Sequence, residues 1–85
     1  MSDEIDRIIM KIPSIVDRGK LFSHVAILKE RAQTGNENAS EEEVEAIIRW
    51  IRSTWTTETV RSKLARKVAR LIEEGEYKKT AKKTA

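Results

Sequence analysis

Apolar side chains recur at helical spacing along most of this chain. Three segments each carry one stripe of apolar residues, namely Ile5, Ile8, Ile9 and Ile12; Val44, Ile47, Ile48 and Ile51; and Val60, Leu64, Val68, Leu71 and Ile72. Positions i, i+3, i+4 and i+7 fall on one face of an α-helix, whereas a half-buried strand needs strict alternation. The pattern therefore predicts an all-α protein, a small bundle of about four helices.

The first two helices are separated by Pro13. Residues 3–12 form the first predicted helix, and proline disfavours the helical conformation at the residue before it, so the chain turns there. A second stripe follows at Leu21, Phe22, Val25 and Leu28. Because Gly19 interrupts this segment, it is either one helix with a weak point at Gly19 or a short turn before a helix over 18–32.

The last two helices are bounded by capping signals. Residues 33–39 (QTGNENA) lack periodicity and predict an exposed loop, and Ser40 with Glu43 matches a capping box that begins the third helix. Poor helix formers over 53–57 predict a break near 54–56, with Thr56 or Thr57 capping the fourth helix, over 57–74. Ala65 and Ala69 are expected to let a neighbouring helix approach closely, and Gly75 is expected to end the fourth helix.

The C-terminal segment has a different composition. Residues 76–85 contain the near-repeat KKTA, KKTA and one large side chain, so little apolar burial is available to offset ordering. We therefore expect a single helical domain over 1–75 and a disordered, lysine-rich tail over 76–85.

Composition excludes several classes of protein. The 85 residues include no Cys and one His, which leaves no disulfide, no thiolate metal site and no histidine cluster for a metal. His24 is interpreted as a structural residue, and the glutamates after Ser40 as helix-capping residues. We predict no enzyme and no cofactor, because no nucleophile, base and orienting group can be placed together. The longest apolar runs are too short for a membrane span and the N-terminus is acidic, so a cytoplasmic protein is expected.

Charge is segregated along the chain and suggests a partner. Residues 1–55 carry 8 basic and 10 acidic side chains, whereas residues 56–85 carry 9 basic and 4 acidic ones. In the fourth predicted helix, Lys63, Arg66, Lys67 and Arg70 recur at helical spacing on the outer face, with no acid between Arg61 and Arg70. Cations on a rigid helix can neutralise several phosphates of a nucleic acid.

The leading interpretation is a small nucleic-acid-binding protein. DNA is favoured over RNA because exposed aromatic platforms for single strands are lacking. The predicted contact residues are Arg61, Lys63, Arg66, Lys67, Arg70, Lys78, Lys79, Lys82 and Lys83. A helix-turn-helix formed by the third and fourth helices is a poorer match, because the turn lacks Gly and the second helix is long.

The alternative is a non-catalytic protein-interaction module, such as an adaptor, inhibitor or assembly subunit. Its candidate contact residues are Trp50 and Trp55. Trp50 lies off the apolar stripe of the third helix, so it either covers the core beside the second helix or lines a partner-binding surface. A homodimer is compatible with both interpretations, since a small core gains from burying more apolar area.

Overall fold

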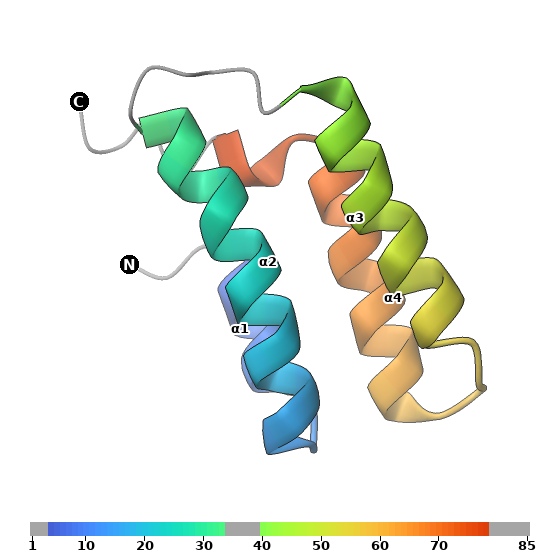
Figure 1. Cartoon of the computed structure of the whole chain (residues 1–85). Coiled ribbons are helices and arrows are strands. Elements are labelled where there is room, and N and C mark those ends of the chain that lie inside the picture. Colours follow the sequence, from blue (N-terminus) through green and yellow to red (C-terminus); the bar gives the residue numbers. More distant parts are fainter. Residues whose placement is uncertain (1–3, 34–39, 79–85) are drawn as a thin grey trace.

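Four α-helices form the part of the chain that the computed structural model describes, residues 4–33 and 40–78 (Figure 1). They are α1 (Glu4–Met10), α2 (Ile15–Gln33), α3 (Glu41–Thr54) and α4 (Val60–Glu73). No strand occurs in these two ranges, so the all-α prediction is confirmed.

The N-terminal half forms a short hairpin of α1 and α2. The four isoleucines of the first stripe are all buried, and the chain turns at Pro13 as predicted. Of the two alternatives for the second segment, the structure shows a single helix that passes through Gly19 without a break. The Ser14 hydroxyl accepts a hydrogen bond from the Asp17 amide at 3.3 Å, which explains the early start of α2.

The start of α3 agrees with half of the predicted capping box. The Ser40 hydroxyl accepts from the Glu43 amide at 3.3 Å. The Glu43 carboxylate accepts from the guanidinium of Arg31 on α2, so Glu43 joins two helices. Residues 34–39 of the predicted loop lie outside the described residues.

The start of α4 differs from the prediction. Thr59 is the N-cap and accepts from the Ser62 amide at 3.2 Å, so α4 begins at Val60 rather than near Thr57. The Thr57 hydroxyl instead lies 2.7 Å from the Ser62 hydroxyl within the connection between α3 and α4. The prediction that Val60 belongs to the buried stripe was wrong, because this side chain in the first turn is 67% exposed.

The core lies between α4 and the other helices. α3 and α4 run side by side in opposite directions, α1 packs against α4, and α2 packs against α1 (Figure 1). Ala65 and Ala69 of α4 are fully buried, so their small side chains permit the close approach that was predicted. A helix-turn-helix sets its second helix steeply across the first, and the antiparallel pair of α3 and α4 does not have that geometry.

The folded region extends beyond Gly75. Gly75 adopts a left-handed φ of 83° and ends α4 as predicted. Residues 76–78 form a further helical turn, and Tyr77 is only 3% exposed within the hydrophobic core. The folded region therefore includes Tyr77 and Lys78, past the predicted boundary at Gly75, because the Tyr77 ring is part of the core. The rest of the predicted tail, 79–85, lies outside the described residues.

Candidate nucleic-acid interface

Four cationic side chains of α4 gather on one face. Lys63, Arg66, Lys67 and Arg70 line a shallow depression of about 410 Å³, and no carboxylate is among the residues that line it. At a rise of 1.5 Å per residue, the row from Lys63 to Arg70 extends about 10 Å along the helix axis. We call the surface formed by these four side chains the α4 basic face. It has the arrangement that the sequence spacing predicts.

Arg66 makes hydrogen bonds to the backbone and is less exposed than Lys63. Its guanidinium donates hydrogen bonds to the backbone oxygens of Trp55, at 2.8 Å, and Thr57, at 3.0 Å. Its side chain is 30% exposed, against 62% for Lys63. Arg66 therefore fastens the connection between α3 and α4, and only part of its hydrogen-bonding capacity faces outward. Local spacing does not predict these two hydrogen bonds, because the carbonyl partners are set by the shape of the connection between α3 and α4.

Two acidic residues flank the α4 basic face. Glu58 approaches Lys63 at 3.8 Å and Arg66 at 3.7 Å, and Glu74 approaches Arg70 at 3.8 Å. These long, exposed ion pairs contribute little to the stability of the fold, because each charge remains solvated. Among the described residues Lys67 has no salt bridge. A phosphate could therefore approach Lys67 without displacing a carboxylate.

The remaining predicted cations lie elsewhere. Arg61 approaches Asp17 of α2 at 3.2 Å and so links the first turns of α2 and α4. Lys78 follows Gly75 and lines a different pocket, between α3 and α4. Lys79, Lys82 and Lys83 lie outside the described residues. The structure thus brings together four of the nine predicted contact residues.

The two tryptophans take part in internal packing. Trp55 is 4% exposed, so it offers almost no surface to a partner. Trp50 is half-buried, stacks on His24 with 4.0 Å between ring centroids, and meets Trp55 edge-on at 5.1 Å. Trp50 therefore covers the core beside α2, the first of the two roles predicted for it. His24 has the structural role expected from the sequence.

Sequence reasoning missed the pocket that includes Tyr77. It lies between the start of α3 and the turn after α4, and is lined by Glu41, Val44, Glu45, Ile48, Ile72, Glu73, Gly75, Tyr77 and Lys78. The only sequence signal was one aromatic residue in an otherwise small and basic segment. Its burial depends on the chain reversal at Gly75, which local patterns do not reveal.

The described ranges contain neither a group of metal ligands nor a membrane-spanning helix. No group of three or more His, Cys, Asp or Glu side chains there is placed to hold a metal ion. None of the helices in those ranges is long and apolar enough to cross a membrane. Comparison of the chain with protein-family models, curated proteins and solved structures finds no significant match.

Proposed function

We propose that this protein binds nucleic acid, with duplex DNA favoured, through the α4 basic face. The observation that carries the proposal is the common surface formed by Lys63, Arg66, Lys67 and Arg70. Phosphates attract such a surface and release condensed counterions when they are neutralised. The phosphates of one DNA strand rise by about 3.4 Å each along the duplex axis, so a row of about 10 Å lying parallel to that axis would extend over roughly three of them.

The preference for duplex DNA is supported by the placement of the aromatic rings. Proteins that hold single strands usually stack bases on exposed aromatic side chains. Here Trp55 and Tyr77 are buried, and one face of Trp50 is taken by His24. A rigid helix with outward cations suits contact with backbone phosphates rather than bases. We therefore expect binding with little dependence on base sequence.

The test is a charge-reversal pair on the α4 basic face that leaves Arg66 intact. Lys63→Glu with Lys67→Glu should weaken binding to a fluorescent random-sequence duplex by about tenfold or more at low salt, as read by fluorescence anisotropy. Both side chains are exposed, so circular dichroism should show an unchanged fold. The Lys11→Glu, Lys20→Glu protein is the matched control, because it changes net charge equally at exposed positions outside α4.

The control makes the result decisive. If the control retains most of the wild-type affinity, binding depends on the α4 basic face. Equal loss in both variants would mean that only net charge matters and would contradict an interface on α4. Absence of duplex binding by the wild-type protein at low salt would refute the proposal altogether.

A second candidate function, protein interaction, is favoured by exposed apolar side chains of the hairpin. Met10, Ile15, Val16 and Ile27 are all exposed, with Ile15 at 79%. Large apolar side chains left in water suit an interface with another chain, including a second copy. Sedimentation of the wild type and of Ile15→Ser, Val16→Ser tests the homodimer. A wild-type dimer that dissociates in the variant would support this candidate, and a monomeric wild type would exclude self-association.

A further inference from the structure

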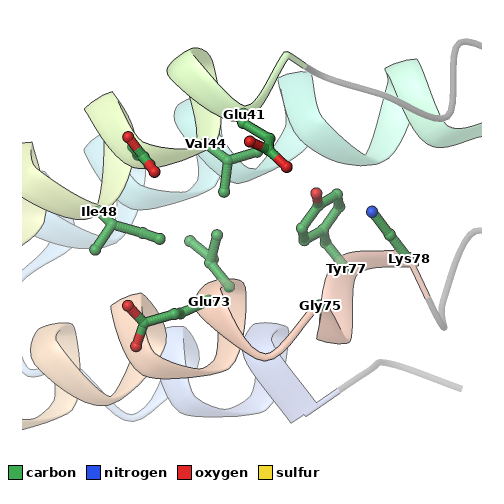
Figure 2. Close-up of a pocket in the computed structure, with 9 residues that line it drawn as sticks. Glu41, Val44, Ile48, Glu73, Gly75, Tyr77 and Lys78 are labelled. Atoms are coloured by element: carbon green, nitrogen blue, oxygen red, sulfur yellow. The ribbon is translucent and has the colours of Figure 1, made fainter.

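The pocket between α3 and the turn after α4 has an apolar floor and charged edges. Its volume of about 610 Å³ lies within the range of small-ligand sites. Figure 2 shows Val44 and Ile48 of α3 directed into the pocket, the Tyr77 ring at one end, and the carboxylates of Glu41 and Glu73 at the edges. Ile72 of α4 also lines the pocket. Such a pocket combines apolar contact area with a few polar groups that can orient a ligand.

The Tyr77 hydroxyl is a polar group without a partner in this pocket. The side chain is 3% exposed, and Figure 2 shows its oxygen directed toward α3, on the side of Glu41 and Val44. No hydrogen bond to this hydroxyl occurs among the described residues. The ring is buried but the hydroxyl oxygen itself is not enclosed, so it is available to hydrogen-bond a group that enters the pocket. Burial also raises the pKa of Tyr77 above its ordinary value of 10.0.

The charge of the pocket favours a cation. Glu73 already accepts from Arg52 at 3.2 Å, but Glu41 and Glu45 have no salt bridge within the described ranges. The structure also places one ammonium at the edge, since Lys78 Nζ lies 5.9 Å from the centroid of the Tyr77 ring. That distance permits a cation–π contact, so the ring already accepts an ammonium group.

We propose that this pocket binds a primary ammonium group carried on an apolar stem. The ammonium would donate to the carboxylates of Glu41 and Glu45 and to the Tyr77 hydroxyl, and the stem would lie on Val44, Ile48 and Ile72. Two sources have this chemistry, a free alkylamine and a lysine side chain of another protein. Lys78 is a weak internal competitor for the same place, because it carries the same group on the same kind of stem.

The experiment compares n-hexylamine with the neutral 1-hexanol by nuclear magnetic resonance titration of the full chain. Hexylamine should shift the signals of Glu41, Glu45 and Tyr77 in a saturable way, whereas hexanol should bind more weakly. Equal binding of hexanol and hexylamine would overturn the proposed ammonium site. If neither compound shifts these signals, a free alkylamine is excluded as the ligand, and the comparison of lysine and norleucine peptides decides whether the site binds an ammonium group. The α4 basic face lies outside this pocket, so Lys63→Glu, Lys67→Glu should bind hexylamine normally.

Variants assign the binding to named groups. Glu41→Gln with Glu45→Gln should weaken hexylamine binding about two- to fivefold, as expected for exposed charge pairs. The Glu30→Gln, Glu42→Gln protein removes the same charge at exposed positions outside the pocket and should bind like the wild type. Tyr77→Phe should weaken binding while preserving the buried ring, and Lys78→Ala should strengthen it. Equal weakening by both glutamine pairs would overturn the assignment to Glu41 and Glu45.

A peptide arm distinguishes the two sources. A short peptide with one central lysine is compared with the same peptide carrying norleucine, which has the stem without the ammonium. Preferential binding of the lysine peptide with no response to hexylamine would support a protein ligand, and the reverse would support a free amine. No preference for the charged member in either pair would overturn the proposal.

Discussion

The imidazole ring of His24 stacks on the indole ring of Trp50, with 4.0 Å between the centroids and 23° between the planes. This contact joins α2 to α3. Trp50 in turn meets Trp55 edge-on, so a line of aromatic groups runs from the surface of α2 to the core. Offset and edge-to-face pairs add stability beyond the area they bury. The Trp50 side chain therefore connects the hairpin of α1 and α2 to α3 through its contact with His24.

Replacing Trp50 by alanine should therefore destabilise the protein. We expect a loss of about 2 kcal/mol in the free energy of unfolding, below the ~3–5 kcal/mol typical of a fully buried Trp, because Trp50 is half-buried. Urea denaturation followed by circular dichroism measures the change. Ile15→Ala, at an exposed position, should change stability by no more than about 0.5 kcal/mol. Equal stability of Trp50→Ala and wild type would contradict a packing role for the stack.

Arg66 should contribute to stability where Lys67 does not. Arg66→Ala removes the donor to the Trp55 and Thr57 carbonyls, so we expect a loss of about 1–2 kcal/mol. Lys67→Ala, one position along α4, should leave the urea midpoint nearly unchanged because its side chain is exposed. If both variants unfold at the same urea concentration, the hydrogen bonds of Arg66 are not structural.

These contacts show which parts of the fold can be predicted from the sequence. The stripe that begins at Ile5, the turn at Pro13, the cap at Ser40 and the helix end at Gly75 were all predicted, because each depends on residues within one or two helical turns. The start of α4 was not predicted correctly, because Thr56, Thr57 and Thr59 can each cap a helix with the same side-chain hydroxyl. The choice among them depends on tertiary contacts around the connection.

At the candidate site, too, the sequence predicts local features but not contacts between distant segments. The shared face of Lys63, Arg66, Lys67 and Arg70 follows from helical periodicity and was predicted. The internal hydrogen bonds of Arg66 and the link between Arg61 and Asp17 join segments distant in sequence, so local spacing could not reveal them. Burial of Tyr77 requires the chain to fold back after Gly75, and composition alone predicted a tail.

Truncation locates the end of the folded domain. Deleting 79–85 should leave the thermal midpoint nearly unchanged, whereas deleting 76–85 also removes Tyr77 from the core. Loss of a buried aromatic ring is expected to reduce stability by about 3 kcal/mol, which lowers the midpoint by roughly 4–8 °C for each kcal/mol. Differential scanning calorimetry of both truncated proteins measures the shifts. The same midpoint for the two proteins would place the domain end at Gly75.

Nucleic-acid binding should depend steeply on salt. If the α4 basic face and the C-terminal lysines together neutralise about four to six phosphates, the logarithm of affinity should fall with the logarithm of salt at a slope of about −4 to −5. Deleting 79–85 should reduce this slope and weaken binding equally for all duplex sequences, because those lysines would contact phosphates only. Anisotropy titrations at several salt concentrations give the slope. A slope near zero would refute binding through phosphates and favour the interaction module.

Tyr77 should make the protein less stable at high pH. Burial raises the pKa of its hydroxyl above the ordinary value of 10.0, so the folded state holds this proton more tightly than the unfolded state. As pH rises above about 10, the unfolded chain releases the proton first, and the free energy of unfolding falls until the folded state also titrates. Urea denaturation at a series of pH values from neutral to 11.5 would measure this fall.

The matched variant for that measurement is Tyr77→Phe, which keeps the ring and removes the titrating group. Lysines titrate in the same pH range in both proteins, so the difference between the two stability curves isolates Tyr77. We expect the curves to run parallel below pH 9 and the wild type to lose stability relative to Tyr77→Phe above pH 10. Parallel curves over the whole range would show that the Tyr77 hydroxyl is equally hydrated in the folded and unfolded chains, which contradicts its burial in the core.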